Sequence, residues 1–246
     1  MIDIHCHILP EIDDGPKTKE EAIKMSCLAV DSGTDIVFAT PHFMNGVFTT
    51  DLMSISIKTK AFSNTLKHSN IPLAIFEGAE IRISSKTAEM MSTGELPGLG
   101  QTRYYLIELP STFIKEGVLR IVRQMVDMGG VPIIAHPERN YMIMKQPELI
   151  DDLLDAGVRF QLTGKSVTGK NDRISFKISR QMIMENKAHY IASDGHDLYY
   201  RPPRLDTVFK ILKKSADEKT AKKLLIENPK EIVDQALNTN FALKEM

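Results

Sequence analysis

The first residues of the chain carry a His-x-His pair that could bind a metal ion. His5 and His7 follow a short apolar run that predicts a β-strand. Successive side chains of a strand point to opposite faces, so the two imidazoles share one face and Cys6 points away from it. Two imidazoles about 7 Å apart along an extended chain can converge on one ion. One such pair is weak evidence by itself, because most buried histidines belong to an ordinary core.

Other side chains that can bind metals recur where later predicted strands end. Histidines or carboxylates stand at the ends of six of the predicted strands, and Asp14 can fold back from the first loop to join them. Five of the seven histidines belong to this set, a concentration that chance would not produce. The predicted metal ligands are His5, His7, Asp14, His42, Glu80, Glu108, His136, Asp194 and His196.

The chemistry of this set predicts a cluster of transition-metal ions. Imidazole and carboxylate donors without a thiolate suit Mn²⁺, Fe²⁺ or Zn²⁺, and the set is too rich in nitrogen for Mg²⁺ or Ca²⁺ alone. Nine ligands are too many for one ion, so we expect several ions and a bridging carboxylate. Such a centre lowers the pKa of bound water and holds the attacking and leaving oxygens of a displacement. The set therefore favours hydrolysis, above all of a phosphoester.

Two arginines favour a phosphate substrate. Arg139 lies three residues beyond His136, and Arg201 lies five residues beyond His196, in loops that leave the same predicted edge. Guanidinium groups bind phosphate oxygens bidentately and offset the charge of a transferring phosphoryl group. We therefore predict that Arg139 and Arg201 are both catalytic and substrate-binding residues. The alternative for each is a loop arginine in a surface ion pair.

The elements that must position these residues alternate along the chain. Continuous apolar runs of strand length, such as 35–40, 72–79 and 104–107, alternate with segments of helical pattern. Strands of this kind pair in parallel and are buried on both faces. We count seven such units and no dividing linker, so the sequence predicts an α/β protein with one domain over residues 1–246. A distorted TIM-like (β/α)₇ barrel, or a distorted eight-stranded form, would bring all strand ends to one point.

One helix carries a specific start signal. Thr18 and Glu21 have the spacing of a capping box, and the apolar residues of the helix that follows are Ile23, Cys27 and Val30.

Composition excludes several classes of function. The 31 basic and 32 acidic residues give a net charge of −1, which indicates neither nucleic acid nor an anionic membrane as a partner. The first apolar run contains Asp3 and His5, unlike a targeting peptide, and no run approaches the roughly 20 residues that span a bilayer. Two cysteines make no disulfide framework and indicate a reducing compartment, so we expect a cytoplasmic protein without membrane insertion.

A phosphatase with a cysteine nucleophile is also excluded. Such enzymes need an arginine six positions after the cysteine, whereas Ile12 follows Cys6 and Gly33 follows Cys27 at that distance. Cys6 is instead expected to be a small buried apolar residue.

These motifs together resemble the PHP (polymerase and histidinol phosphatase) superfamily. More closely, the chain resembles the bacterial manganese-dependent protein-tyrosine phosphatases encoded with capsular and exopolysaccharide loci. The resemblance covers nearly the whole chain in the family's order and spacing, and its motifs are residues 1–7, 13–16, 40–42, 78–81, 134–139, 192–196 and 201–203.

The resemblance implies a distorted (β/α)₇ barrel with a trinuclear metal site. The implied ligands are His5, His7, Glu80 and Asp194 for the first ion, a bridging Glu80 with Glu108 and His136 for the second, and Asp14, His42 and His196 for the third. Arg139 and Arg201 match the family's phosphate-binding arginines. Histidinol phosphatases would use histidines where this chain has Asp14 and Glu108, which favours the tyrosine phosphatase branch.

The implied reaction is hydrolysis of phosphotyrosine by a metal-bridging hydroxide, with Mn²⁺ as the expected ion and no phosphoenzyme. The partner would be a phosphotyrosine-bearing protein such as a bacterial tyrosine kinase, so that the enzyme regulates capsular or exopolysaccharide synthesis. Phe48 could form a wall for the phenyl ring, with Tyr199 and Tyr200 on the other side, or these residues could simply anchor their loops.

Three alternatives remain open from sequence. Histidinol phosphate or another small phosphate ester would use nearly the same site. A nuclease of the same superfamily is disfavoured by the balanced charge. A metal-stabilised binding module without turnover is disfavoured because a structural metal site would need no arginines facing a phosphate. The sequence leaves the oligomeric state open.

Overall fold

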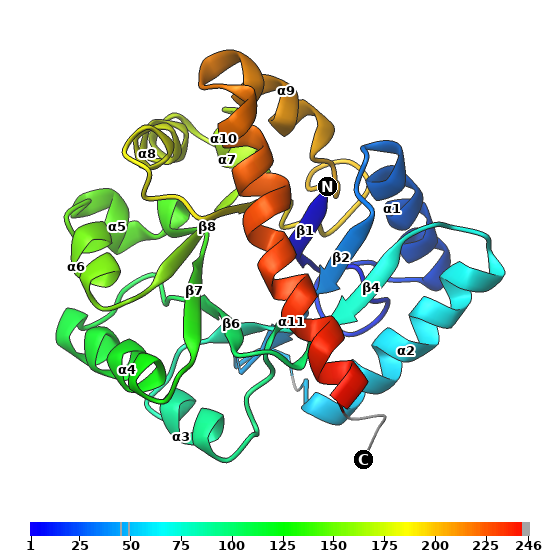
Figure 1. Cartoon of the computed structure of the whole chain (residues 1–246), viewed down its shortest axis with the longest axis horizontal. Coiled ribbons are helices and arrows are strands. Elements are labelled where there is room, and N and C mark those ends of the chain that lie inside the picture. Colours follow the sequence, from blue (N-terminus) through cyan, green and yellow to red (C-terminus); the bar gives the residue numbers. More distant parts are fainter. Residues whose placement is uncertain (45, 49, 243–246) are drawn as a thin grey trace.

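Parallel strands at the centre of the protein are surrounded by helices (Figure 1). The computed structural model describes residues 1–44, 46–48 and 50–242. The strands are β1 (Ile2–Cys6), β2 (Ile36–Ala39), β3 (His42–Phe43), β4 (Ala74–Glu77), β5 (Glu80–Arg82), β6 (Tyr104–Glu108), β7 (Val131–Ala135), β8 (Arg159–Thr163) and β9 (Tyr190–Ala192). The helices are α1 (Lys19–Asp31), α2 (Leu52–His68), α3 (Thr87–Ser92), α4 (Lys115–Asp127), α5 (Tyr141–Lys145), α6 (Leu149–Asp155), α7 (Gly164–Val167), α8 (Arg173–Met184), α9 (Asp206–Ser215), α10 (Glu218–Lys222) and α11 (Asn228–Ala242). Short helical turns cover Leu99–Gln101 (η1), Pro137–Arg139 (η2) and Lys223–Glu227 (η3).

The strands form two parallel sheets, in the orders β1-β2-β4 and β3-β5-β6-β7-β8-β9. A bridge between Cys6 and Gly195 joins β1 to the residues after β9, and the backbone N–H of Asp194 donates to His5 O at 2.8 Å. The sheets thus curve around a common axis, with β2 continuing into β3 and β4 into β5. The predicted α/β fold with seven TIM-like strand positions is confirmed, although the described strands do not form a continuous closed barrel.

Two predicted strands are each followed by a second short strand that the sequence analysis did not predict. The strand expected over 72–79 is β4, and β5 begins beyond it at Glu80; the strand expected over 35–40 is β2, and β3 begins beyond it at His42. Between β2 and β3, Pro41 has no backbone N–H to donate to a strand hydrogen-bond ladder. Between β4 and β5, a Cβ on Gly78 would lie 2.7 Å from Leu99 Cδ2, so the chain passes close to this side chain there.

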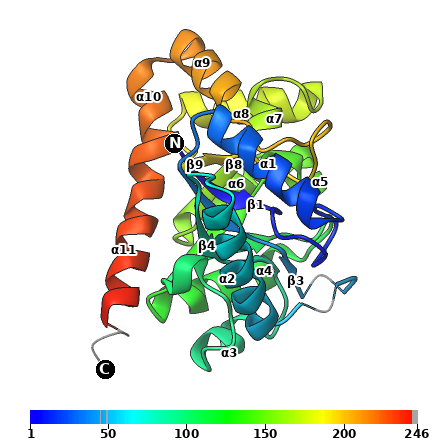
Figure 2. The same cartoon turned by 90° about the vertical axis from the view of Figure 1, so that its right-hand side faces the viewer.

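At the end of the barrel that helix α11 covers, apolar side chains fill the interior. Helix α11 crosses the strands in Figure 1 and lies along one side of the molecule in Figure 2. Its Ile232, Val233 and Ala236 are buried among side chains of β1, β2, β6, β7 and β9. Gly100 of η1 has a φ of 61°, and a Cβ there would lie 2.6 Å from Ala236 Cβ. The helix therefore closes one end of the barrel, and the polar groups lie at the other end.

The outer helices pack on the strands through a second apolar layer. The predicted capping box of α1 is confirmed, because the backbone N–H of Glu21 donates to Thr18 Oγ1 at 3.1 Å. Of the expected apolar residues, Ile23 and Val30 are partly buried against the core, whereas Cys27 is exposed. The helix also buries small or flexible side chains that permit close approach, namely Ala22, Met25, Ser26 and Ala29. Within the described residues, no helix is both long and apolar enough to cross a membrane.

Candidate metal centre

The open end of the barrel brings all nine predicted ligands to one place. The carboxyl ends of parallel strands meet there, as in other barrels of this kind. The contributing segments are β1 with the loop after it, the starts of β3 and β5, the end of β6, and the residues that follow β7 and β9. From these come His5, His7, Asp14, His42, Glu80, Glu108, His136, Asp194 and His196.

Glu80 lies at the centre of this group and is almost completely buried. Its oxygens approach four imidazoles: His136 Nε2 at 2.6 Å, His42 Nδ1 at 3.0 Å, His7 Nε2 at 3.4 Å and His5 Nε2 at 3.6 Å. Burial disfavours the charged carboxylate, but the surrounding imidazoles hold the pKa of Glu80 well below its usual value. The carboxylate is therefore ionised and shared among several ligands, as a bridging group requires.

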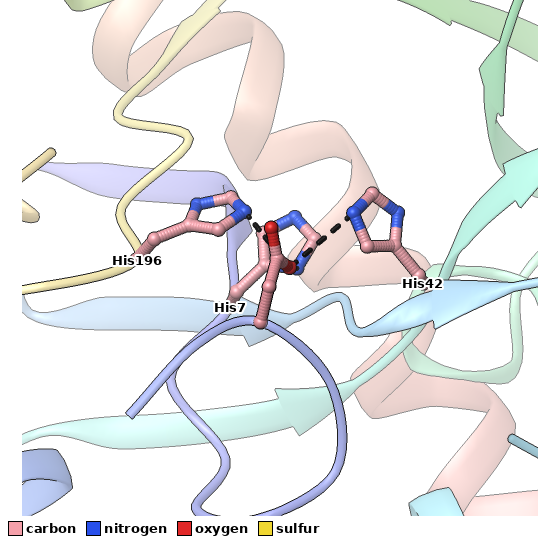
Figure 3. A group of neighbouring side chains, drawn as sticks. His7, His42 and His196 are labelled. Carbon is pink, nitrogen blue, oxygen red and sulfur yellow. Dashed lines mark ion pairs between the residues drawn. The ribbon is translucent and has the colours of Figure 1, made fainter. Parts of the chain in front are cut away.

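A second group forms around Asp14. Its Oδ1 lies 3.4 Å from His42 Nε2, 3.4 Å from His196 Nε2 and 4.0 Å from His7 Nδ1. Figure 3 shows the rings of His7, His42 and His196 directed toward one another. One ligand atom from each of the four residues lies within 4.8 Å of the others. This arrangement adds His7 to the set that the resemblance implies for the third ion.

Two other groupings also differ from the implied sets. His5, His7 and Glu80 form one compact group, and His42, Glu80 and Glu108 form another. Asp194 lies 3.4 Å from His5 Nε2, between the first group and two arginines. His136 contacts Glu80 but belongs to none of the compact groups among the described residues.

The donor atoms fit divalent cations. The Nε2 atoms of His5 and His7 face each other at 3.2 Å, and one proton at most can lie between two such nitrogens. His196 Nε2 is buried and makes no hydrogen bond within the described residues, although Asp14 Oδ1 lies 3.4 Å away. A buried nitrogen without a partner costs free energy, which coordination to an ion would recover. Imidazoles and ionised carboxylates so arranged are suited to Mn²⁺, Fe²⁺ or Zn²⁺.

Two residues that the sequence did not reveal orient the first histidines. His5 Nδ1 is 2.8 Å from Gln161 Oε1, and His7 Nδ1 is 2.6 Å from Asp13 Oδ2. Each partner oxygen can accept a hydrogen bond from the Nδ1–H group, which leaves Nε2 to bind an ion. The alternation of residues 159–163, with polar side chains at 159, 161 and 163, could have revealed that Gln161 faces the barrel interior.

The two predicted arginines lie at the edge of the group. Arg201 Nη2 donates to Asp194 Oδ1 at 2.7 Å, and Arg139 pairs with Asp194 Oδ2. About one third of each arginine side chain is exposed, so both remain accessible from outside. Asp194 and His136 have positive φ values of 53° and 35°, a backbone conformation that non-glycine residues adopt mainly where the fold demands it.

A third arginine also reaches this site. Arg82 Nη2 lies 2.9 Å from Glu108 Oε2. Burial and the negative charge of Glu80 raise the pKa of Glu108, and Arg82 opposes that rise. Because Arg82 stands two residues after Glu80 on β5, its side chain could have been expected on the same face.

The apolar loop after His42 contributes one ring to the site. Phe48 stacks on the His42 imidazole with ring centroids 5.9 Å apart and planes 4° apart. Phe43 is instead buried in the core, and Val47 is 77% exposed. Phe48 therefore contacts a predicted ligand.

The excess of carboxylates holds protons on two histidines. Burial favours neutral imidazole, but Asp13 and Glu80 raise the pKa of His7 to about 9, and Asp14 and Glu80 raise that of His42 to about 10. Both rings are therefore protonated at neutral pH in the protein without metal. The site attracts positive charge, which a divalent ion would supply in place of these protons.

Comparison with known proteins identifies relatives over nearly the whole chain. A model of the family described as "Capsular polysaccharide synthesis, CpsB/CapC" matches residues 1–234. Tyrosine-protein phosphatase YwqE of Bacillus subtilis strain 168 is 34% identical over 201 residues, which cover 82% of this chain and 79% of YwqE. Tyrosine-protein phosphatase CpsB of Streptococcus pneumoniae is 29% identical over 238 residues, which cover 95% of this chain and 98% of CpsB.

The fold comparison agrees with the sequence comparison. A crystal structure from a study of YwqE and CpsB, described as unique metal-dependent tyrosine phosphatases, superposes with a TM-score of 0.91 at 31% identity. The match covers 96% of this chain and 95% of the other.

Metal binding should depend steeply on pH. Because an ion must displace protons from His7 and His42, we expect Mn²⁺ affinity to rise between pH 6.5 and 9, with release of up to about two protons per protein. Calorimetric titration in buffers of different ionisation enthalpy measures both quantities. Affinity that does not change over this range would contradict the protonated state of the two rings.

The raised pKa values of His7 and His42 also determine how the free energy of unfolding of the metal-free protein varies with pH. A histidine whose folded pKa is raised stabilises the protein fully below its unfolded pKa of about 6.5, and that contribution is lost as the pH rises through the folded value. The free energy of unfolding of the metal-free protein should therefore fall between pH 7 and 9.5. The metal-loaded protein, measured in parallel by urea unfolding, should show little of this decline.

Asp13 should support metal binding without being a ligand. We expect Asp13→Asn to weaken Mn²⁺ binding by roughly 10- to 100-fold, because the amide no longer fixes the His7 ring with Nε2 free. Calorimetric titration measures the loss. Asp31→Asn, at the end of α1 and away from the site, is the matched control. Equal affinities for the two variants would show that Asp13 has no such role.

Proposed function

This chain belongs to the family described as capsular polysaccharide synthesis, CpsB/CapC, and on that premise we propose that it is a metal-dependent phosphatase that hydrolyses phosphotyrosine in proteins. One observation above all supports this activity: the nine metal-competent side chains gathered around Glu80 lie directly beside two accessible arginines. A metal site that only stabilises a fold needs no cations at its edge, whereas a phosphoester substrate does.

The metal set is part of the proposal. We propose a trinuclear Mn²⁺ centre held by His5, His7, Asp14, His42, Glu80, Glu108, His136, Asp194 and His196, with Fe²⁺ or Zn²⁺ as alternatives. When bound, such ions supply an activated water and stabilise charge on the phosphoryl oxygens. Glu80 would bridge ions because its two oxygens face histidines from three different segments.

The residues of the chain then bind and orient the substrate. Arg139 and Arg201 would hold the phosphate oxygens, and their present pairing with Asp194 keeps both guanidinium groups beside the metal ligands. Phe48 would contact the phenyl ring, because its stacking on the proposed ligand His42 places it beside the metal centre. Phenolate is a tolerable leaving group, with a parent pKa of about 10, so the reaction does not depend on a strong general acid.

The biological setting follows from the resemblance. We propose that the substrate is a phosphotyrosine-bearing protein such as a bacterial tyrosine kinase, and that dephosphorylation regulates capsular or exopolysaccharide synthesis. The two cysteines, Cys6 and Cys27, are unpaired, which supports a cytoplasmic location. Residues 1–246 would form one domain, since β1 and the segment after β9 are bridged across most of the chain.

Histidinol phosphate is the strongest alternative substrate, because it would use nearly the same ligands. The carboxylates of Asp14 and Glu108 favour phosphotyrosine. Their placement among the metal-competent groups supports that preference.

The decisive experiment compares the two substrates after metal is removed with chelator and Mn²⁺ is restored. We expect phosphate release that depends on Mn²⁺ and favours a phosphotyrosyl peptide over histidinol phosphate. His136→Ala should lower kcat/KM by roughly 100-fold or more, because it removes a contact of the central carboxylate and a metal donor. His68→Ala, on the outer helix α2, is the matched control and should keep full activity. Preference for histidinol phosphate would reassign the substrate, and inactivity on both would overturn the proposal.

Phe48 should matter most for a phosphotyrosyl peptide. Phe48→Ala should raise KM for such a peptide by roughly 2- to 10-fold, the value of one aromatic contact, and raise KM for a small aryl phosphate far less. Steady-state kinetics on both substrates measures the difference. Val47→Ala, at an exposed position of the same loop, serves as the control. A similar loss on both substrates would mean that Phe48 only supports the loop.

A further inference from the structure

A cavity of about 430 Å³ opens beside the metal centre. Arg139, Asp194 and Arg201 form the side nearest the metal ligands. The other lining residues come from α7 and the loop after it, from the rest of the loop between β9 and α9, and from the start of α9. This volume lies in the range of about 300–1,000 Å³ that is typical of ligand sites, so there is room for more than one phosphate group.

The walls of the cavity are strongly cationic. Its only acidic lining residue is Asp194, whereas its cationic lining residues are Arg139, Lys165, Lys170, Arg201 and Arg204. Asp194 already pairs with Arg139 and Arg201, and Asp206 pairs with Arg204. Across the described part of the chain, Lys165 and Lys170 have no ion-pair partner. The charges of Lys165 and Lys170 thus face a cavity whose other charged lining residues also carry a net positive charge.

The cavity walls are ordered by packing and hydrogen bonds. A Cβ on Gly164 would lie 2.8 Å from Val208, so α7 packs directly against α9. The backbone N–H of Lys170 donates to Lys165 O at 3.0 Å, which joins the two lysine positions in one turn. The lysines therefore stand on a supported wall, and their positions do not depend on a bound ligand.

The rim of the cavity carries two exposed aromatic rings. Tyr199 and Tyr200 are 84% and 82% exposed. Their backbone N–H groups donate to Asp197 Oδ1 at 2.6 and 2.5 Å, and that of Arg201 donates to the same oxygen at 3.2 Å. One carboxylate thus orders the loop that carries both the rim and a phosphate-facing arginine. Exposed aromatic residues on an ordered loop are typical of surfaces that bind a peptide.

We propose that this cavity is a subsite for an acidic side chain of the substrate, and that Lys165 and Lys170 make the enzyme prefer phosphotyrosines flanked by Asp or Glu. The inference rests on the proposed function and extends it to the choice of substrate. In an extended peptide, side chains two positions apart share one face and lie about 7 Å apart, so the residue two positions from the phosphotyrosine reaches the space beside the arginines. A carboxylate there would balance the lysine charges that the protein leaves unpaired.

The test uses the metal-loaded full chain and two matched phosphotyrosyl peptides. One peptide carries Asp and Glu around the phosphotyrosine, and the other carries Asn and Gln at the same positions. We expect kcat/KM to favour the acidic peptide by roughly 3- to 30-fold, mainly through KM, as two partly exposed ion pairs would give. The preference should shrink as salt is raised, because screening weakens such pairs.

Variants assign the preference to the two lysines. Lys165→Ala/Lys170→Ala should abolish it, and Lys165→Glu/Lys170→Glu should reverse it. Hydrolysis of a small aryl phosphate, which does not reach the cavity walls, should stay within about 2-fold and so shows that both variants fold. The control variant Lys60→Ala/Lys67→Ala, at exposed positions of α2, should keep the preference.

The outcomes separate this inference from the proposed function. Equal use of both peptides by the unmodified protein, or a preference that survives in Lys165→Ala/Lys170→Ala, would overturn the subsite and leave the phosphatase assignment intact. Failure of the metal-loaded protein to hydrolyse either peptide or the aryl phosphate would overturn both proposals.

Discussion

The carboxylate of Glu80 is the charge around which the protein is arranged. Taking an ionised carboxylate out of water costs several kcal/mol unless partners replace the lost hydration. The partners here are imidazoles from β1, β3 and the end of β7, so elements far apart in sequence must meet before Glu80 can be buried. The carboxylate thereby links the fold to the chemistry. The groups that balance its charge in the metal-free protein are the same groups that would bind ions around it.

Rigid support on two sides makes this concentration of charge possible. At one end of the barrel, α11 closes the apolar interior, so the polar groups can occupy only the other end. Around the histidines, Asp13 and Gln161 each hold an Nδ1 atom and direct Nε2 inward. Asp3 extends this support, because its buried Oδ1 accepts from the backbone N–H of Ser193 at 3.0 Å and ties β1 to the loop that carries Asp194. His5, His7 and the loop of Asp194 are thus supported by neighbours that do not themselves belong to the set.

The proposed metal ligands and the proposed substrate-facing residues come from different kinds of structure. Apart from Asp14, which lies in the loop between β1 and α1, the proposed ligands stand on strands or within a few residues of them. The arginines, Phe48 and the two lysines of the cavity stand on loops and short helices at the rim. Such a division lets the loops determine which phosphoester is accepted while the strands determine the reaction. It also explains why the charge of the whole chain, which is nearly zero, says nothing about the cationic cavity.

The sequence alone determined the seven α/β units and the set of candidate ligands, because apolar runs and the residues at their ends are local patterns. It could not show that His42 and Glu80 begin the strands β3 and β5, since these two strands are defined by pairing with each other in space. Nor could it reveal Asp13 and Gln161, whose partners are chosen by distance in space. Which ligands share an ion, and where unpaired cations face a cavity, are decided only when distant loops are brought together. Tertiary structure alone sets those distances.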